Sequence, residues 1–513
     1  MHIYISWLQI SLLQFFPFAQ NNTETLLMNT SNKNFKQSFG LLDATMVVAG
    51  SMIGSGIFIV SAEITRKTGS AGWLTLMWVL TAVITIIAAL SYGELAGMFP
   101  KAGGQYVYLR EAYNPFVAFL FGWTQFGVIQ TGSIAAVGVA FASFTAYIIP
   151  SWGSDHLLWK TGGFQVSAAQ LVAITSIVLL TFINSRGVKN GRLIQTIFTA
   201  TKLLALFGLI VLGLTIGASH KVWQANWQSA WTPLAWQIVN GQVTAAALSG
   251  MALLGAMAVS MKGSLFSSDS WNNVTFIAAE IKNPQKNIGR ALFLGTLIVS
   301  LTYIAANLMY LAVLPLHDIA FASNDRVGVA VAEKIFGNSG SLIIAVLLMI
   351  STFGCNNGLI LSGARVYYTM AKDGLFLKKT GQLNKFSVPS NGLWIQCCWA
   401  CVLCLSGRYN DLLAMVIFGV LIFYILTICG IFILRIKQPG LPRPYKAFGY
   451  PVLPLVYIIS ATTLALLLLV YESGYTVPGL AIILLGIPVY YLVKRNNHTL
   501  LHKDADPSIQ STI

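Results

Sequence analysis

The chain has 513 residues, of which 56% are hydrophobic and only 9% are charged. Soluble globular domains carry roughly 25% charged residues, so this composition excludes a soluble globular protein and indicates a protein that crosses a membrane many times. The formal net charge of +15 would also suit a nucleic-acid-binding protein, and the position of that charge decides between the two.

Apolar runs long enough to cross a bilayer as helices need about 20 residues each. The chain contains about twelve such runs, and we predict an all-α polytopic membrane protein. In chain order the runs cover residues 41–64, 72–99, 115–149, 167–184, 193–217, 254–280, 291–315, 340–371, 392–406, 411–434, 452–471 and 477–493.

The basic residues are distributed unevenly between the two sides of these spans. With a cytoplasmic N-terminus, 22 of the 31 Lys and Arg residues fall on the inner side and 7 on the outer side, and Lys202 and Lys262 lie within spans. Cytoplasmic loops carry an excess of Lys and Arg, so we predict a multi-pass protein of the cell (inner) membrane with both termini cytoplasmic. The charge then serves topology and contact with the lipid bilayer, and we expect no nucleic acid partner.

Residues 1–38 are predicted to form an N-terminal extension and a cytoplasmic tail. Residues 3–19 are apolar, but they lack the basic region with which a signal peptide begins. Two interpretations of residues 1–27 remain open: a start codon assigned upstream of Met28, or a helix that lies in the membrane interface.

The sequence "CCWACVLC" (397–404) contains a C-x-x-C-x-x-C run, a spacing that also occurs in iron–sulfur and zinc sites. The run lies inside an apolar predicted span, with no histidine or acidic residue close to it. Cysteine is also an ordinary small buried residue. We therefore expect no metal and no other cofactor.

Two spans are interrupted in corresponding positions. The first contains "GSMIGSG" (50–56), and the sixth contains "GSLFSSDSWNN" (263–273). Small residues in one span also allow close helix packing, but paired breaks are typical of a transporter binding site. Because five spans separate the breaks, the two repeats must be inverted. We predict a first repeat over 39–218, a second over 239–436, helices 11 and 12 over 437–495, and a cytoplasmic tail over 496–513.

The breaks predict a clamp for a zwitterion. Unwound backbone within a membrane is tolerated only where it is buried in protein or lines a cavity. A break that begins at Ile53 frees the amides of Ser55, Gly56 and Ile57, and a helix N-terminus favours an anion such as a carboxylate. The carbonyls of Leu265, Phe266 and Ser267, at the end of the first half of the sixth span, are predicted to accept hydrogen bonds from an ammonium group.

Five segments, taken together, resemble the amino acid–polyamine–organocation transporters, and within them the L-type amino acid transporter family. They are "GSMIGSGIF" (50–58), "YGELAGMFPKAGGQYVYL" (92–109), "SWNNVTFIAAEIKNPQKNIGRA" (270–291), "SGARVYYTMAKDGLF" (362–376) and "RPYKAFGYPVLP" (443–454). The resemblance covers roughly residues 40–495. It implies a LeuT-like fold with ten core helices in a 5+5 inverted repeat, discontinuous helices 1 and 6, two further helices, and alternating access.

Site residues follow from the resemblance position by position. It implies that Ser55 and Gly56 bind the substrate carboxylate, that Phe266 closes the outer side of the site, and that the carbonyls of Phe266 and Ser267 hold the amine. Trp271 and Asn272 match the pair that opens the second half of helix 6. Ser268 stands where relatives often have an aromatic residue, which leaves side-chain selectivity open.

Asp269 is the second departure from the family pattern. A carboxylate in a spanning segment is costly unless paired, so it is a functional candidate by default. It has four interpretations: contact with a substrate amine, proton coupling, a tie between the break and a neighbouring helix, and an N-cap for a half-helix that begins at Trp271.

Lys202 is the buried charge of helix 5. It lies about ten residues from Arg192, roughly 15 Å along a helix, so its ammonium cannot easily reach the interface. The resemblance implies that the ammonium replaces the cation of sodium-coupled relatives and bridges the helix 1 break and helix 8. Lys262 is expected in the outer vestibule or on a helix surface. An inner-gate network of ion pairs is expected among charges at cytoplasmic helix ends: Glu94, Glu280, Arg365 and Asp373.

The resulting prediction is a sodium-independent secondary transporter, an alternating-access exchanger of neutral amino acids. The alternatives are a proton-coupled symporter, and an exchanger of cationic amino acids or polyamines that uses Asp269. An intramembrane enzyme is not expected, because all six histidines fall in tails or loops. Animal members of the family join a heavy chain through a cysteine in the loop between helices 3 and 4. The corresponding loop, 151–165, has no cysteine, so no disulfide-linked heavy chain is expected.

Overall fold

The computed structural model describes residues 35–505 except 162–163, 240–241 and 407–408. The two interpretations of residues 1–27 therefore lie outside the described residues, as does the last part of the predicted C-terminal tail.

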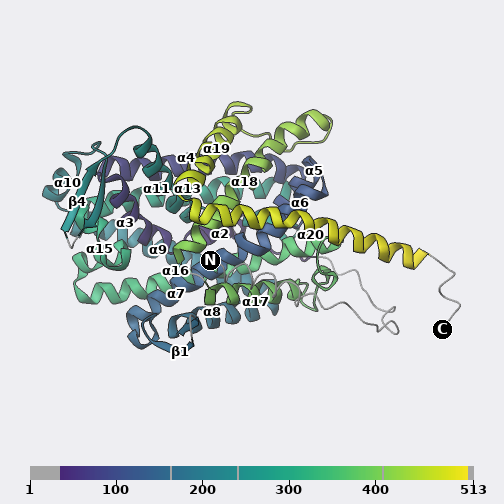
Figure 1. The fold of residues 1–513 in the computed structure, drawn as a ribbon, viewed down its shortest axis with the longest axis horizontal. Coiled ribbons are helices and arrows are strands. Elements are labelled where there is room, and N and C mark those ends of the chain that lie inside the picture. Colours follow the sequence, from purple (N-terminus) through teal and green to yellow (C-terminus); the bar gives the residue numbers. More distant parts are fainter. Residues whose placement is uncertain (1–34, 162–163, 240–241, 407–408, 506–513) are drawn as a thin grey trace. The chain divides into compact units, whose positions relative to one another are not determined.

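Helices make up nearly all of the described chain (Figure 1). The α-helices before the second break are α2 (Leu41–Met52), α3 (Gly56–Thr68), α4 (Ala71–Met98), α5 (Gln105–Ala112), α6 (Pro115–Thr124), α7 (Gln130–Ile148), α8 (Ala168–Ser185), α9 (Val188–Leu212), α10 (His220–Trp227) and α11 (Gly250–Ser267). Those after it are α12 (Asn273–Phe276), α13 (Pro284–Val313), α14 (Leu316–Ala320), α15 (Val327–Phe336), α16 (Asn338–Lys372), α17 (Ser390–Ser406), α18 (Tyr409–Lys437), α19 (Val452–Tyr471) and α20 (Ser473–Ala505). Short π and 3-10 turns are η1 (Gln125–Ile129), η2 (Pro150–Trp152), η3 (Gly213–Gly217), η4 (Ala278–Glu280), η5 (Ser323–Asp325) and η6 (Lys378–Gly381).

Ten of the described helical segments are long and apolar enough to cross a membrane, and the bent pair α2 and α3 makes an eleventh. A shorter apolar helix, Ser390–Leu405, falls where the ninth span is predicted. Each of the twelve predicted runs overlaps one of these helices. The prediction of an all-α polytopic membrane protein is confirmed.

The first span is broken as the glycines and serines indicate. Helix α2 ends at Met52, because Ile53 adopts an extended conformation with φ −74° and ψ 99°. Helix α3 begins at Gly56, and the two axes are bent by 41°.

The second break is longer than the sequence suggests. Helix α11 ends at Ser267, and α12 begins at Asn273 rather than at Trp271 and has only four residues. Between them Ser270 has φ 68°, a left-handed conformation that is uncommon outside glycine. Asp269 lies four residues before α12 and cannot be its N-cap, so that interpretation of Asp269 is wrong.

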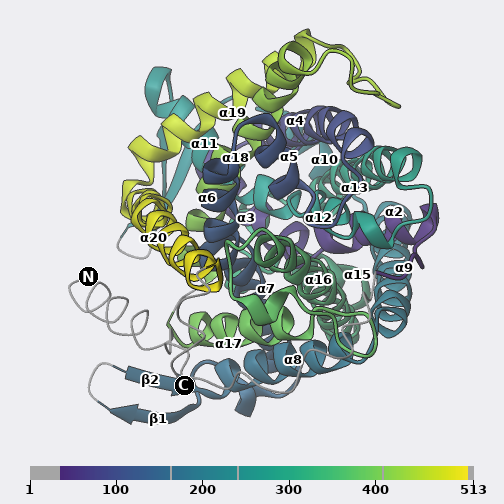
Figure 2. The same ribbon diagram turned by 90° about the vertical axis from the view of Figure 1, so that its right-hand side faces the viewer.

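Helices of the two predicted repeats pack directly against each other. Helix α4 contacts α13, α7 contacts α16, α8 contacts α17 and α3 contacts α11. In the predicted numbering these are helices 2 and 7, 3 and 8, 4 and 9, and 1 and 6. Contacts between helices at different positions of the repeats also occur in matching pairs. Helix α13 packs on α2, and the matching pair is α4 on α11. Helix α16 packs on α9, and the matching pair is α7 on α18. Figure 2, in which many helices are seen nearly end-on, shows α7 and α16 side by side.

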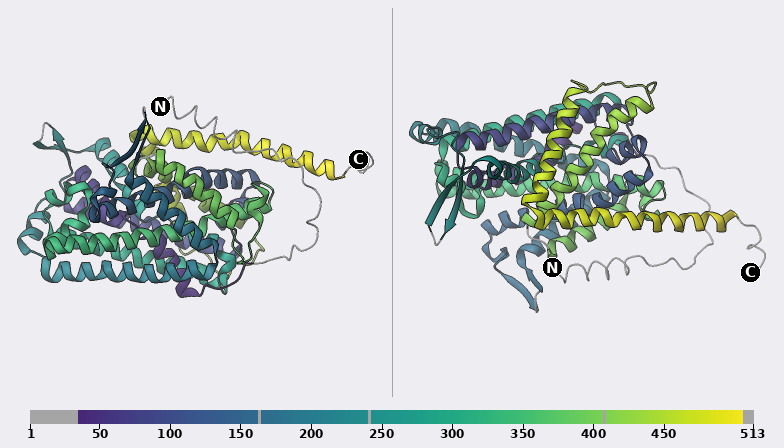
Figure 3. Two further views of the ribbon diagram at one scale, coloured as in Figure 1. Left: turned by 90° about the horizontal axis from the view of Figure 1, so that it is seen from below. Right: turned by 45° about the horizontal axis from the view of Figure 1, so that its top comes forward.

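Two β-hairpins, which the sequence did not lead us to expect, interrupt the helical pattern. Strands β1 (Leu157–Thr161) and β2 (Phe164–Ser167) pair antiparallel between α7 and α8, and β3 (Leu234–Val239) and β4 (Gln242–Ala247) pair antiparallel between α10 and α11 (Figure 3). Strand β3 packs against α3, and the ring of Trp236 stacks on Phe321 with centroids 6.3 Å apart. The second hairpin therefore lies against α3, the second half of the broken first span.

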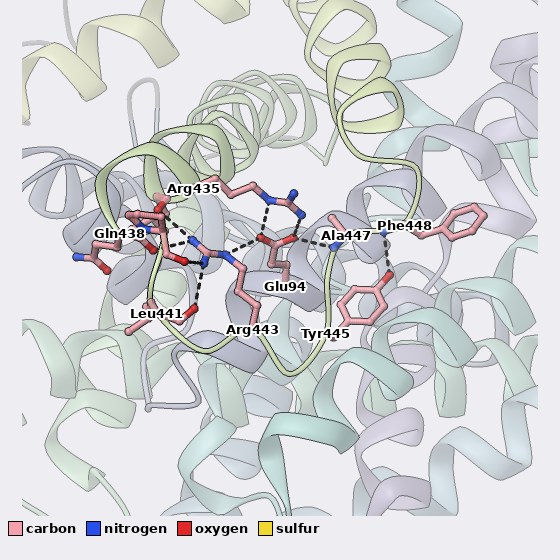
Figure 4. Close-up of polar contacts among 10 residues, drawn as sticks. Glu94, Arg435, Gln438, Leu441, Arg443, Tyr445, Ala447 and Phe448 are labelled. Carbon is pink, nitrogen blue, oxygen red and sulfur yellow. Dashed lines mark hydrogen bonds and ion pairs between the residues drawn. The ribbon is translucent and has the colours of Figure 1, made fainter.

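Glu94 is the centre of one ion-pair group (Figure 4). Its carboxylate is 1% exposed and accepts hydrogen bonds from Arg435 Nε at 3.0 Å, Arg435 Nη2 at 2.7 Å and the Ala447 amide at 2.7 Å. Arg443 Nε lies 3.4 Å from the same carboxylate, and the guanidinium of Arg435 lies 3.6 Å from the centroid of the Tyr450 ring. Glu94 thus connects α4 to the end of α18 and to the segment that leads into α19.

The expected inner-gate charges form separate groups rather than one network. Glu280 Oε1 and Arg365 Nε make a buried pair at 2.7 Å, whereas Asp373 pairs with Arg110 at 2.6 Å. The acidic members and Arg365 are predictable from the sequence, whereas Arg110 and the arginines that bind Glu94 were not predicted.

We expect Arg365→Met to lower the free energy of unfolding by about 3–5 kcal/mol, because it leaves the Glu280 carboxylate buried without its partner. Both side chains are 1% exposed or less. Thermal unfolding in detergent measures the loss. The double variant Glu280→Met/Arg365→Met should recover most of it, since well-packed apolar residues often replace a buried pair at little cost. A single variant as stable as the wild type would contradict this role for the pair.

Candidate functional site

A small cavity lies between the two helix breaks. The residues that line it come from both breaks and from α7 and α16: Ser51, Met52, Gly54, Ser55, Gly56, Ser133, Val137, Phe266, Ser267, Ser270, Cys355 and Leu359. Its volume of about 20 Å³ suits about one water molecule. An amino acid is much larger, so side chains or half-helices must move to admit one.

Ser55 and Gly56, at the start of α3, line this cavity. The leading N–H groups of a helix have no intrahelical acceptor, and the helix dipole adds positive character there. Gly56 brings this end into direct contact with the second break: a Cβ atom at this position would lie 1.9 Å from Ser267 Oγ and 2.7 Å from Ser267 Cβ. Four of the predicted residues, Ser55, Gly56, Phe266 and Ser267, thus line one cavity.

Phe266 and Ser267, at the end of α11, also line the cavity, and the carbonyls at this end of α11 already have donors. The Leu265 carbonyl accepts from the Ser268 amide at 3.1 Å, and the Phe266 carbonyl accepts from the Asp269 amide at 3.2 Å. The Ser268 amide also contacts the Phe266 carbonyl, so these backbone groups are already hydrogen-bonded where α11 ends.

Tyr303 of α13, which the sequence analysis did not identify, contacts both breaks. Its hydroxyl lies 3.2 Å from the Met52 carbonyl and 3.0 Å from the Ser267 carbonyl. One hydroxyl proton is therefore shared between the last carbonyls of α2 and α11, and Tyr303 couples the positions of the two half-helices.

Lys202 of α9 lies against the first break, as the sequence analysis expected. Its side chain is 2% exposed, and its Nζ atom donates to the carbonyls of Gly50 and Ile53, each at 2.5 Å. A cation at the C-terminal end of a helix is stabilised by the helix dipole. Helix α16 bonds neighbouring carbonyls separately, through Ser351 Oγ to Gly54 at 3.2 Å and Cys355 Sγ to Ser51 at 3.0 Å. Lys202 and α16 thus hold the same break from two sides.

A second, more polar cavity lies next to the first and shares Ser133 and Ser270 with it. Its lining comes from the second break, α7 with η1, and α18: Gln105, Phe121, Gln125, Ile129, Gln130, Ser133, Asp269, Ser270, Asn272, Asn273, Val420, Phe423 and Tyr424. The Asp269 carboxylate accepts a hydrogen bond from the Tyr424 hydroxyl at 2.7 Å. Asn272 Nδ2 donates to Gln105 Oε1 at 2.9 Å. Asp269 therefore ties the break to a neighbouring helix, one of the four interpretations given above.

The other predicted site residues line neither of these two cavities. Ile53 and Ile57 have buried side chains, and the Ile53 carbonyl accepts a hydrogen bond from Lys202. Ser268 is buried. Trp271 is buried between aromatic rings, 4.8 Å from Tyr92 and 5.1 Å from Tyr424 by ring centroids.

Three polar residues of the third span were missed although the sequence carries a signal for them. Gln125, Gln130 and Ser133 stand inside an otherwise apolar run, and polar residues within a span commonly face a cavity or the bundle interior. Gln125 Nε2 donates to Gln130 Oε1 at 2.7 Å across the π-helical turn η1, and such turns are frequent at functional sites.

Lys262 lies outside both cavities. Its Nζ atom is 3.0 Å from Glu472 Oε1 and 4.0 Å from Glu63 Oε1, and the residue is 7% exposed. It is thus a buried ion-pair partner that joins α11 to α3 and to Glu472 at the junction of α19 and α20, rather than a residue of an open vestibule or helix surface.

Known proteins resemble this chain over nearly its whole length. A family model described as amino acid permease matches residues 39–489. The serine/threonine exchanger SteT of Bacillus subtilis (strain 168) is 30% identical over 471 residues, which cover 91% of this chain and 99% of the relative. The large neutral amino acids transporter small subunit 2 of Homo sapiens is 30% identical over 458 residues, 89% of this chain and 80% of the relative. The b(0,+)-type amino acid transporter 1 of Mus musculus is 26% identical over 475 residues, 92% of this chain and 91% of the relative.

The match to the family includes both breaks, Lys202 and both cavities. The relatives are transporters rather than enzymes. The chain therefore belongs to the amino acid permease family of multi-pass membrane transporters.

Proposed function

We propose that this protein is a sodium-independent, alternating-access exchanger of neutral amino acids. The observation that carries the proposal is the cavity between two helix breaks, which is lined by residues at the start of α3 and at the end of α11.

Recognition of the substrate backbone needs no ionised side chain. The α-carboxylate binds the amides of Ser55, Gly56 and Ile57, and the α-ammonium binds the carbonyls of Phe266 and Ser267. Tyr303 holds the two poles at a fixed separation through its contacts to both breaks.

The substrate side chain then points toward the second cavity, which adjoins the first at Ser133 and Ser270. Hydroxyl and amide groups dominate its lining, and these suit an uncharged side chain. The names of two relatives, a serine/threonine exchanger and a large neutral amino acids transporter, support neutral substrates for this chain as well. Asn272 is part of this wall, and Ser268 and Trp271 support it from behind.

Sodium independence follows from Lys202. Its ammonium already supplies a positive charge to the Gly50 and Ile53 carbonyls, so a sodium ion at that position would be repelled.

Alternating access follows from a LeuT-like arrangement of twelve helices. The repeats 39–218 and 239–436 exchange their packing partners in pairs, as a two-fold relation between them requires, and 437–495 adds helices 11 and 12. We place both termini in the cytoplasm of a cell whose inner membrane holds the protein, because the charge asymmetry described above favours that orientation. The protein works without a disulfide-linked heavy chain, since residues 151–165 offer no cysteine.

The test is uptake of a labelled neutral amino acid by proteoliposomes that contain the purified protein. We expect internal unlabelled substrate to stimulate uptake, and replacement of external sodium by choline to leave it unchanged. Protein-free liposomes give the background. Uptake that ignores internal substrate and needs an inward proton gradient would support the symporter instead, and uptake that stops without sodium would contradict the role of Lys202.

A second candidate, exchange of cationic amino acids or polyamines, is favoured by Asp269, whose carboxylate lines the second cavity. A thermal-shift screen of the twenty amino acids separates the two candidates, because a ligand that binds only the folded state raises apparent stability. Neutral amino acids should stabilise the wild type and Asp269→Asn alike. Stabilisation by lysine or arginine alone, lost in Asp269→Asn, would establish the second candidate.

A further inference from the structure

Asn273, the first residue of α12, has a side-chain amide that is buried and unpaired. The residue is 2% exposed, and its Nδ2 atom has no hydrogen-bond partner among the residues that the structure describes. Burying a donor in this way is costly, because its hydrogen bonds to water are lost and nothing replaces them. Such a group in a folded protein calls for an explanation, and the position of this amide indicates one.

The unpaired amide belongs to a residue that lines the second cavity. The backbone N–H of Asn273 donates to the Ser270 carbonyl at 3.2 Å, so Asn273 lies one tight turn after a residue that both cavities share. A substrate whose backbone lies between the two breaks can therefore extend its side chain past Ser270 toward Asn273. The volume of the second cavity is about 10 Å³, which suits one oxygen atom the size of a water molecule.

The other side-chain amides of this cavity already donate within the protein. Each of their nitrogen atoms lies 2.7–3.0 Å from a protein oxygen: those of Gln105, Gln125, Gln130 and Asn272. Asp269 adds an acceptor to the same lining, since a carboxylate has about four lone-pair sites and the hydroxyl of Tyr424 occupies one of them. The described lining thus offers a ligand the amide donor of Asn273 and the carboxylate acceptor of Asp269.

We propose that Asn273 determines side-chain specificity, and that the preferred substrates are neutral amino acids whose side chains carry a hydroxyl or a carboxamide. Such a group accepts a hydrogen bond from Asn273 Nδ2 and donates one to the Asp269 carboxylate. Serine, threonine, asparagine and glutamine meet this requirement, whereas valine and leucine leave the amide unpaired. This inference rests on the proposed exchange of neutral amino acids and narrows its substrate class.

Threonine and valine are the most informative pair of ligands, because their side chains have nearly the same shape and differ in one hydroxyl. A site built to bond a substrate hydroxyl discriminates against the analogue that lacks it, since the polar groups of the site then stay unpaired. From the cost of one unsatisfied buried donor, we expect the wild type to bind threonine about 10- to 100-fold more tightly than valine.

The test is isothermal titration calorimetry of the purified full-length protein with threonine, valine and alanine. Alanine has no side-chain atom beyond Cβ, so its affinity reports binding of the substrate backbone alone. In Asn273→Leu, which keeps the size of the side chain without its donor, the preference for threonine over valine should disappear while the affinity for alanine is unchanged. Asn273→Gln retains a carboxamide and should still prefer threonine. Size-exclusion chromatography checks that each variant is folded.

Asn356→Leu is the matched control. Asn356 is also 2% exposed, and its amide atoms also lack a hydrogen-bond partner in the described part of the chain, but it lines neither of the two cavities. Its replacement should leave the preference for threonine unchanged. A wild type that binds valine as tightly as threonine, or the same loss of preference in Asn356→Leu as in Asn273→Leu, would overturn the role of Asn273 and leave the proposed function standing. If no neutral amino acid binds the wild type, the proposed function fails as well.

Discussion

Replacing Lys202 by alanine is expected to reduce amino acid exchange by about 10- to 100-fold while the protein still folds. The ammonium donates to two carbonyls at the end of α2, and hydrogen bonds to charged groups contribute about 1.5–3 kcal/mol each. A loss equal to one such bond, about 1.5–3 kcal/mol, in one conformation of a transport cycle changes a rate or an equilibrium by roughly 10- to 100-fold. Initial rates of exchange in proteoliposomes measure the effect.

The fold should survive because a buried charge is itself costly to desolvate. Removing the ammonium relieves that cost at the same time as it exposes two unpaired carbonyls, so the two changes in stability oppose each other. Lys202→Met, which keeps the length of the side chain without its charge, should lose exchange to a similar extent. A monodisperse Lys202→Ala protein with wild-type exchange would refute the role assigned to this residue.

The sequence was sufficient to predict the breaks and the buried lysine because each violates a local rule. Gly50, Gly54 and Gly56 weaken a helix where an apolar run needs one, and Lys202 puts a charge where lipid or protein would surround it. Such violations are visible in one segment at a time. The matching break near Ser267 then indicates that the two breaks belong to one binding site.

The contacts between distant segments were not predictable in the same way. Tyr303 looks like an ordinary aromatic residue of a span, and its hydroxyl becomes informative only when α13 lies beside both breaks. Asp269 attracted attention, but Tyr424, which holds it, is 155 residues away. An N-cap was the natural local interpretation of Asp269, and it failed because the unwound segment extends to Asn272.

Ion pairs attach both broken spans to their surroundings, on either side of the cavity. Arg66 of α3 donates to Asp325 at 2.5 and 3.0 Å, and Glu280, just after α12, pairs with Arg365 of α16. In the alternating-access cycle proposed above, we expect these two groups to open in turn, because each attaches a half-helix to its surroundings. The central contact between Gly56 and Ser267 differs from them, since it joins the two breaks to each other.

Gly56→Ala is therefore expected to reduce exchange by about 100-fold and to destabilise the protein by about 1–3 kcal/mol, the usual cost of overpacking. The added methyl group would lie 1.9 Å from Ser267 Oγ, 2.7 Å from Ser267 Cβ and 3.1 Å from Ser267 Cα. A rotation of the serine side chain relieves only the first contact, so the two breaks must separate. A displacement of about 1 Å at a binding site is enough for a loss of this size. Exchange in proteoliposomes and thermal unfolding in detergent measure the two effects.

Two further variants separate this clash from the general effect of losing a glycine. Gly208→Ala places a methyl group in α9 where no atom lies within 4 Å, so exchange should be unchanged and the helix slightly more stable, since alanine favours helix by about 1 kcal/mol over glycine. The double variant Gly56→Ala/Ser267→Gly removes the serine Cβ and Oγ but keeps the carbonyl that binds the amine. The double variant should recover most of the stability that Gly56→Ala loses. Its exchange rate should also be higher than that of Gly56→Ala alone. Equal defects in the single and double variants would show that Gly56 acts without Ser267, and the two breaks would then not form one site.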